Sequence, residues 1–173
     1  MLSDLFDLEV DLRLSLARQF IDGVTFMHEH GVAHLDLNPS NVVVDLKTQL
    51  LRIIDFSLSI RVYGGEDADM IGYFVGTLGW TAPEVGKPDR QPRRFSATRA
   101  DVWACGKVVK DLWGRGMPSP LLDPLRDVAQ MLLAENPRST PRMRDVCLAA
   151  SNTGTDASSS APFANQPIRA TAS

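Results

Sequence analysis

The chain has 173 residues, of which 44% are hydrophobic and 23% are charged. This length allows one domain with its own core and is too short for two domains of ordinary size. The formal net charge of -3 excludes a protein that binds polyanions over its whole surface. We therefore expect neither nucleic acid nor a membrane among its partners.

The amino-terminal residues lack the features of a targeting peptide. Four acidic residues precede Arg13, the first basic residue, and no continuous apolar run follows them. No apolar run in the chain is long enough to cross a bilayer. We expect a cytoplasmic or nuclear location. Cys105 and Cys147 are too few for a disulfide framework or a zinc site, and their contexts indicate buried helix faces.

The first half of the chain predicts a helix followed by a β-hairpin. Apolar residues three or four apart predict a helix over residues 8–29, which Gly31 ends. A compact polar loop follows over residues 34–41. The β-branched run 41–45 and the run 50–55 predict two strands, which the intervening turn joins into a short hairpin.

The second half predicts three helices after a long irregular segment. Many glycines and prolines exclude a long element over residues 56–100, and a long loop of this kind usually serves a site or regulation. Helical patterns then run over residues 98–112, 121–134 and 141–150, and Ser96 or Thr98 is the expected cap of the first. The fold class is therefore expected to be α+β, mainly α, over residues 1–150. Residues 151–173 form a Ser/Thr/Ala-rich tail that we expect to be disordered.

Three oxygen-bearing side chains are expected to converge at the mouth of the hairpin. Asn41 starts the first strand and Asp55 ends the second, so that pairing of the strands brings these ends together. Asp36 lies on the loop just before. One carboxylate beside one amide suits a divalent cation that keeps its waters and a phosphate. For each residue alone, loop capping or a strand-end turn is the favoured interpretation.

Four ordered motifs together resemble the protein kinase family. His34–Asn41 is similar to its catalytic loop, and Asp55-Phe56-Ser57 to its metal-binding Asp-Phe-Gly. Gly76–Glu84 looks like the Gly-Thr…Ala-Pro-Glu segment, and Asp101–Gly106 like the start of the central helix. Small-molecule kinases share the loop but lack the Ala-Pro-Glu segment, so the protein kinase branch is favoured.

The resemblance implies the fold and the cofactors. It covers about residues 5–150 and implies the carboxy-terminal lobe of a protein kinase, with a small hairpin and with the amino-terminal lobe absent, since no Gly-x-Gly-x-x-Gly occurs. It implies ATP and Mg2+ as cofactors and a protein Ser or Thr hydroxyl as substrate. Without the other lobe, we expect an exposed apolar face that fits a protein partner.

The resemblance also implies a role for each matching residue. Asp36 would accept the proton of the substrate hydroxyl, and Thr77 would position the catalytic loop. Asn41 and Asp55 would hold the magnesium ions. Val43 would lie under the adenine, and Asn38 stands where a Lys normally contacts the γ-phosphate. The implied structural residues are His34 and Phe56, which stack, and Asp101, which ties the catalytic loop to the central helix.

Several positions depart from the family pattern. Leu35 replaces an Arg that reads a phosphorylated loop, and no Ser or Thr lies between Ser59 and Thr77, so we expect no switching by Ser/Thr phosphorylation. Ser57 replaces the Gly of Asp-Phe-Gly. Thr140 replaces the Arg that pairs with Glu84. The candidate substitutes for that Arg are Arg138, Arg142 and Arg144.

Other features keep a plain and a functional interpretation open. His28 and His30 match no catalytic role and are interpreted as cations at a helix end. The basic residues of the segment 87–99 form either a solvated loop or a docking patch for acidic peptides or phosphate. The rival to an active kinase is a non-catalytic, pseudokinase-like binding module or a truncated gene product. Asp36, Asn41 and Asp55 favour the enzyme, whereas Asn38 and the missing lobe favour the binding module.

Overall fold

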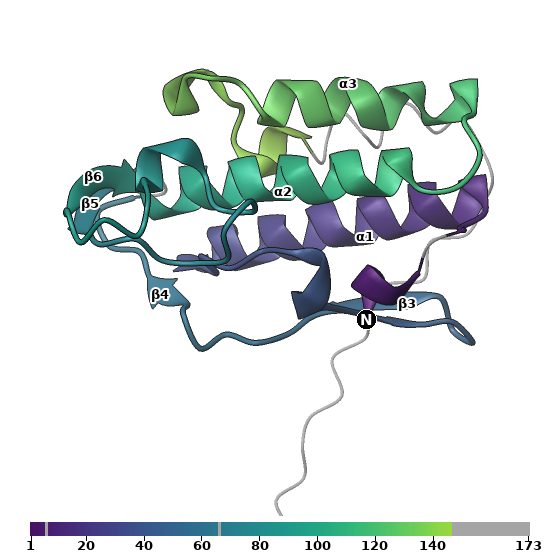
Figure 1. The fold of residues 1–173 in the computed structure, drawn as a ribbon, viewed down its shortest axis with the longest axis horizontal. Coiled ribbons are helices and arrows are strands. Elements are labelled where there is room, and N and C mark those ends of the chain that lie inside the picture. Colours follow the sequence, from purple (N-terminus) through teal and green to yellow (C-terminus); the bar gives the residue numbers. More distant parts are fainter. Residues whose placement is uncertain (6, 66, 147–173) are drawn as a thin grey trace, which may run out of the picture.

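Three stacked helices form the body of the molecule (Figure 1). The structure is a computed structural model that describes residues 1–5, 7–65 and 67–146. Helix α2 (Ala97–Gly114) lies between α1 (Val10–Glu29) and α3 (Asp123–Leu132). Short two-stranded sheets and loops cover the edge of α1 and one end of the stack.

Helix α1 forms where the apolar spacing predicted it. Leu16, Phe20 and Val24 recur every four residues and are fully buried in the main core. The helix ends because Gly31 takes a φ of 68°, a left-handed conformation that suits glycine after a helix. The chain then turns directly into the loop that carries the candidate site.

The strands form three antiparallel pairs. The predicted hairpin is confirmed as β2 (Val42–Asp45) paired with β3 (Leu50–Ile53). The expectation of an irregular segment over residues 56–100 is only partly right, because three short strands lie in it. Within that segment, β4 (Ile60–Arg61) pairs with β1 (Val32–Ala33), and β5 (Asp69–Gly72) pairs with β6 (Arg93–Ser96). Both pairs join segments that are distant in sequence, so no local turn signal marks them.

Helix α2 is held at its start by a side-chain cap and along its length by α3. The Ser96 hydroxyl accepts a hydrogen bond from the backbone N–H of Arg99, which confirms Ser96 as the cap. Gly106 allows close packing, since a Cβ placed there would lie 2.8 Å from the Cβ of Leu132. The next helical stretch begins at Met143 and is described to Val146. The rest of the predicted helix 141–150, Cys147 and the tail 151–173 lie outside the described residues.

Short 3-10 turns join these elements and begin mostly at a proline. They cover Leu2–Asp4, Pro39–Asn41, Pro83–Val85, Pro120–Leu122 and Pro137–Ser139, labelled η1 to η5. Proline favours such starts because its φ is already helical and its missing N–H is not needed there. Of the described helices, none combines the length and hydropathy needed to span a membrane.

Two arginines clamp the amino terminus to the far end of α2. Arg13 is 1% exposed, and its guanidinium donates to the carbonyl oxygens of Trp113, Arg115 and Met117. Arg115 in turn donates to the carbonyl oxygens of residues 2 and 5. These bonds satisfy carbonyls at the end of a helix, where no further turn supplies an N–H.

Candidate active site

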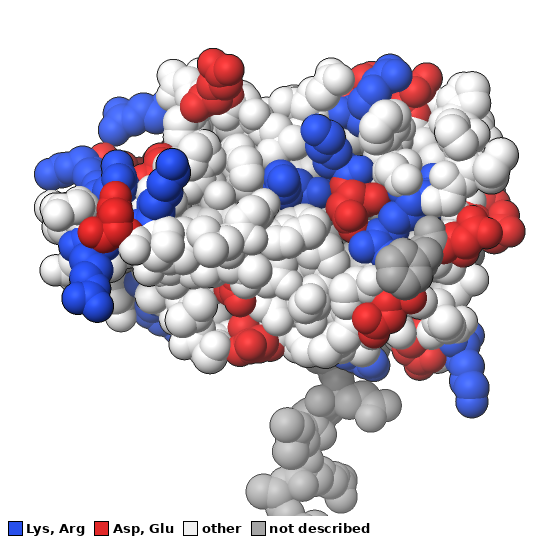
Figure 2. Space-filling model, viewed as in Figure 1, with Lys and Arg blue, Asp and Glu red and all other residues white. Residues whose placement is uncertain are grey.

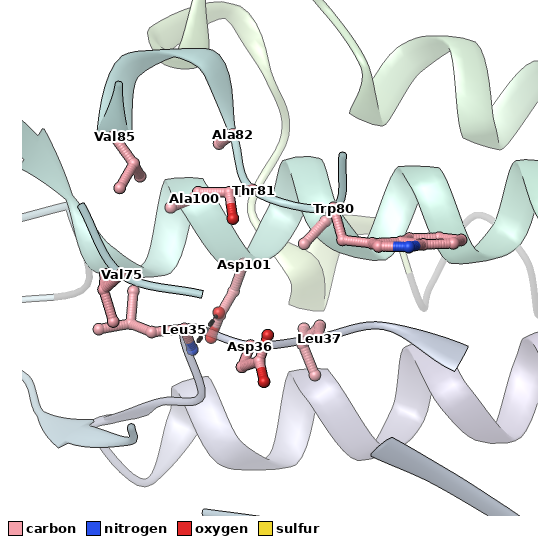
Figure 3. A pocket seen from close by; sticks show the side chains of 11 residues that line it. Leu35, Asp36, Leu37, Val75, Trp80, Thr81, Ala82, Val85, Ala100 and Asp101 are labelled. Atoms are coloured by element: carbon pink, nitrogen blue, oxygen red, sulfur yellow. Dashed lines mark hydrogen bonds between the residues drawn. The ribbon is translucent and has the colours of Figure 1, made fainter. Parts of the chain in front are cut away.

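Asp101 holds the loop of residues 34–41 against α2. Its carboxylate is 1% exposed and accepts a hydrogen bond from the backbone N–H of His34 at 2.6 Å. It also accepts one from the backbone N–H of Leu35 at 2.8 Å (Figure 3). The His28 Nε2 lies 3.1 Å from the same carboxylate. A buried charge of this kind is stable only when several donors satisfy it. The link between this loop and the central helix, expected from sequence, is therefore present.

The loop backbone is strained where it carries the site. Leu35 has a φ of 65°, which costs a β-carbon-bearing residue about 1 kcal/mol or more. The two hydrogen bonds that the backbone N–H groups of His34 and Leu35 donate to Asp101, together with burial of the Leu35 side chain, hold this conformation. Gly76 packs so closely on it that a Cβ there would lie 2.7 Å from the Leu35 carbonyl oxygen. The loop of residues 34–41 and the segment 75–85 are thus in close contact at these two residues.

The Asp36 carboxylate is fixed by three side chains. The Thr77 hydroxyl donates to Oδ1 at 2.7 Å, and the Asn41 amide donates to Oδ2 at 2.9 Å. The Asn38 amide also donates to Oδ1, at 3.1 Å. The structure therefore brings Asp36, Asn41 and Thr77 together at one point. Hydrogen bonds at both oxygens fix the direction of this carboxylate.

Asn38 is part of this network and not an exposed side chain. It is 4% exposed, and its Oδ1 accepts from the backbone N–H of Ser40 at 2.9 Å. Its Nδ2 contacts Asp36 and the Thr77 hydroxyl. Asn38 therefore orients the two groups beside it.

The hairpin brings the backbone just before Asp55 beside Asn41. Val42 pairs with Ile53, and the next residue, Ile54, donates its N–H to the Asn41 carbonyl oxygen at 2.9 Å. Asp55 has a φ of 62° and is exposed. The hydroxyl and backbone N–H of Ser57 hold the pKa of Asp55 below its ordinary value. Asp55 therefore carries its negative charge at neutral pH.

Asn41 and Asp55 offer oxygens of the kind that magnesium takes as ligands. Because the Asn41 amide nitrogen is committed to Asp36, its Oδ1 is the atom left for a cation. Asp55 adds an ionised carboxylate. Magnesium keeps most of its waters and commonly takes only one or two protein oxygens, so this small donor set suffices. The described residues hold no group of three or more His, Cys, Asp or Glu side chains that suits a more tightly coordinated metal.

The rest of the predicted set lies around this point. Val43 is half-buried on β2. The rings of His34 and Phe56 are 4.9 Å apart at 56°, so the expected contact between them is present. Between the loop, the segment 75–85 and α2 lies a gap of only about 10 Å³, which is lined by Leu35, Asp36, Leu37, Val75, Trp80, Thr81, Ala82, Val85, Ala100, Asp101 and Ala104 (Figure 3). This gap has room for about one water and is not a ligand pocket.

Comparison with known proteins decides the family. The family model described as the protein kinase domain matches residues 6–155. This chain belongs to the protein kinase family. The match includes the catalytic loop, the Asp-Phe-Ser segment and the Ala-Pro-Glu segment, and so agrees with the resemblance read from the motifs.

Several kinases are similar to this chain over part of their length. The serine/threonine-protein kinase mos of Patiria pectinifera is 34% identical over 111 residues, which cover 61% of this chain and 30% of the relative. The sperm motility kinase 2B of Mus musculus is 28% identical over 160 residues, covering 80% of this chain and 31% of the relative. CBL-interacting protein kinase 17 of Oryza sativa subsp. japonica is 37% identical over 95 residues, which cover 54% of this chain and 20% of the relative. The chain thus spans about a third or less of the curated kinases it matches.

The glutamate of the kinase Ala-Pro-Glu segment has no hydrogen-bond partner among the described residues. Both carboxylate oxygens of Glu84 are buried and lack a hydrogen-bond partner. Burial raises the pKa of Glu84. The expected substitutes for the missing Arg are therefore wrong. Arg138 pairs with Asp69 and Arg142 with Asp67.

The pair of His28 and Asp101 was missed by sequence reasoning. His28 lies in the last turn of α1, is 4% exposed and reaches Asp101, a contact that its interpretation as a cation at a helix end did not include. The signal was its position four residues after Val24, on the buried face of α1. His30 is exposed at the helix end, where its Nδ1 lies 2.7 Å from the Phe26 carbonyl oxygen.

Proposed function

We propose that the described residues form the carboxy-terminal lobe of a kinase that transfers the γ-phosphoryl group of ATP to a Ser or Thr hydroxyl of a protein. The observation that carries this proposal is the Asp36 carboxylate, held by Asn38, Asn41 and Thr77. A carboxylate fixed at both oxygens keeps one direction for an incoming hydroxyl. The Ser/Thr choice is supported by the serine/threonine-protein kinase among the relatives.

In this proposal, Asp36 acts as the base. The substrate hydroxyl oxygen forms a bond to the γ-phosphorus, and the bond from that phosphorus to the β–γ bridging oxygen breaks. The hydroxyl proton passes to Asp36, and ADP carries away the negative charge of the leaving oxygen. Thr77 keeps Asp36 oriented through its hydroxyl, so it acts as a positioning residue.

The remaining roles concern the cofactors. Magnesium, when bound, neutralises charge on the phosphates, and Asn41 Oδ1 with the Asp55 carboxylate would hold it. Val43 on β2 would support the adenine ring. Asn38 supplies no positive charge to the γ-phosphate, and its contacts support a role in orienting Asp36.

The test is an assay of phosphate transfer from radiolabelled ATP to Ser, Thr and Tyr peptides. We expect transfer to Ser or Thr that requires Mg2+ and disappears in Asp36→Asn. Asp89→Asn is the matched control, because Asp89 lies outside the site and pairs with Arg93 on the surface. Transfer that survives in Asp36→Asn would contradict the assignment of the base.

A second candidate is a kinase-like binding module without activity. Asn38 favours it, and so do the partly exposed apolar side chains on and after the hairpin, which are Leu46, Leu50, Phe56 and Leu58. We propose this face as the place for a protein partner. In the same assay, no transfer above that of Asp36→Asn would favour the module over the enzyme.

A further inference from the structure

A hollow opens between α2 and α3, away from the candidate active site. Its volume is about 300 Å³, and it is lined by Lys110 and Trp113 of α2 and by Arg126, Ala129, Gln130 and Leu133 of α3. Ala129 is buried and Leu133 half-buried, so the floor is aliphatic. Lys110 and Gln130 are exposed and form a polar rim. The hollow suits an apolar side chain that has polar or charged neighbours.

A line of aromatic and basic side chains leads along α2 to this hollow. Lys107 lies over the rings of both Trp80 and Trp103, with its Nζ 5.6 Å from each ring centroid. Trp103, Lys107 and Lys110 are spaced three or four residues apart, which places them on one side of the helix. Figure 3 shows the Trp80 side chain lying along α2. From Trp103 to Trp113 the helix rises about 15 Å, the length of about five residues of extended peptide.

This line combines all three tryptophans of the chain, and each remains partly exposed. Tryptophan, more than other residues, contributes energy at protein interfaces, because its large ring loses water on contact. We name the surface formed by Trp80, Trp103, Lys107, Lys110, Trp113 and the hollow the Trp–Lys groove.

The acids near the groove are already paired with arginines. Asp111 lies 2.6 Å from Arg115, and Arg126 lies 3.1 Å from Asp123 and 3.4 Å from Asp127. In the described part of the chain, neither Lys107 nor Lys110 has an acidic partner. Figure 2 shows Lys and Arg side chains gathered over α2 and α3. The two lysines therefore leave a local positive charge on a chain whose net charge is -3.

We propose that the Trp–Lys groove docks an acidic segment of a protein partner, with carboxylates at Lys107 and Lys110 and an apolar side chain in the hollow. This binding does not depend on the proposed phosphoryl transfer. A single-stranded nucleic acid fits less well, because Lys107 covers two of the rings that its bases would stack on, and because the net charge of the chain repels a long polyanion. Residues 151–173 fit less well because Asp156 is their only acidic side chain.

The test uses fluorescence anisotropy with a labelled peptide in which glutamates flank a Leu-Phe pair. We expect it to bind the full chain, to quench tryptophan fluorescence and to weaken as salt rises. The matched peptide, with glutamine in place of each glutamate, should bind the wild type about tenfold more weakly. The glutamate peptide should bind Lys107→Glu/Lys110→Glu about tenfold more weakly than it binds the wild type. Lys47→Glu/Lys87→Glu makes the same change of charge on exposed residues elsewhere and should bind as the wild type does.

Several results would overturn the proposal. The first is that the glutamine peptide binds as tightly as the glutamate peptide. The second is that the two charge-reversal variants lose the same affinity for the glutamate peptide. The third is that a single-stranded oligonucleotide binds more tightly than the peptide. If deletion of residues 151–173 raises the affinity for the peptide tenfold or more, the tail and not a partner occupies the groove. If circular dichroism shows that the charge reversal unfolds the chain, Lys107→Gln/Lys110→Gln makes the same comparison. Asp36→Asn should bind the peptide as the wild type does, which separates this test from that of phosphoryl transfer.

Discussion

At the scale of single residues, one buried carboxylate organises the catalytic loop. Asp101 accepts from His34 and Leu35, which precede it by 67 and 66 residues, and it contacts His28 on α1. It therefore joins α1, the loop and α2 through one side chain. The strained φ of Leu35 persists because these bonds exceed its cost.

Replacing Asp101 with Asn should destabilise the fold. The amide has one acceptor oxygen and a donor group where two backbone N–H groups converge, so at least one buried donor loses its partner. We expect a loss of about 2–4 kcal/mol in the free energy of unfolding, measured by urea denaturation. Asp89→Asn breaks an exposed pair and should cost less than about 1 kcal/mol. Equal losses in the two variants would contradict this account of Asp101.

Glu84 should make stability depend on pH. Its pKa in the folded chain is raised above the ordinary 4.5 by burial, so the folded state holds this proton more tightly than the unfolded state. The stability it contributes is fully present below pH 4.5 and is lost as pH rises through the raised pKa. We expect the wild type to lose stability relative to Glu84→Gln over that window, as measured by thermal unfolding at a series of pH values. A constant difference between the two proteins would show that Glu84 is hydrated or paired.

At the scale of elements, the segment 75–85 matters because it closes onto the catalytic loop. Thr77 reaches Asp36 from it, and Gly76 lies against the Leu35 carbonyl oxygen. Both contacts depend on a backbone path that only glycine follows freely at residue 76, where φ is 101°.

Gly76→Ala should therefore cost more than Gly79→Ala. Both glycines have positive φ, so both variants pay about 1 kcal/mol for the backbone. A Cβ at residue 76 would also meet Leu35 at 2.7 Å and Thr81 at 2.9 Å, whereas one at residue 79 meets nothing within 4 Å. We expect Gly76→Ala to lose at least about 1 kcal/mol more stability, measured by chemical denaturation, and to lose phosphate transfer. Similar losses in the two variants would mean that the contact with Leu35 is loose.

Elements marked by local signals were predicted, and those made by distant contacts were not. The hairpin of β2 and β3 follows from two β-branched runs around a turn, and the start of α2 follows from Ser96. The pairing of β5 with β6 joins residues more than 20 apart, and no periodicity marks it. In the site, motif order identified Asp36 and Asn41. The lack of a partner for Glu84 among the described residues and the contact of His28 with Asp101 depend on which side chains meet across the core, which spacing alone does not specify.

At the scale of the whole molecule, the residues proposed to contact ATP lie on a surface open to water. Asp55 is exposed, and Val43 is half-buried. A nucleotide bound there would lose little of its hydration, and its charges would remain screened. The described residues therefore present the groups proposed for chemistry on an open surface.

We expect this chain to bind ATP weakly, with a Kd of about 1 mM or higher. Little surface is removed from water, so the cost of holding the nucleotide is not offset. Isothermal titration calorimetry with ATP and Mg2+ measures this, and Asp55→Asn serves as the control for the metal-dependent part. Micromolar binding by the wild type would show that residues elsewhere in the chain enclose the nucleotide.

The contacts of Arg13 and Arg115 have a consequence for folding while the chain is being synthesised. Arg13 is translated 100 residues before Trp113, the first of its acceptors, and Arg115 must reach back to residues 2 and 5. At ordinary rates of translation, this interval lasts roughly 5–20 s. During that time α1 can form as a helix, but the Arg13 guanidinium has only water for a partner. A ribosome stalled before Trp113 therefore holds a chain in which α1 has been synthesised but Arg13 has not yet formed its hydrogen bonds to the end of α2.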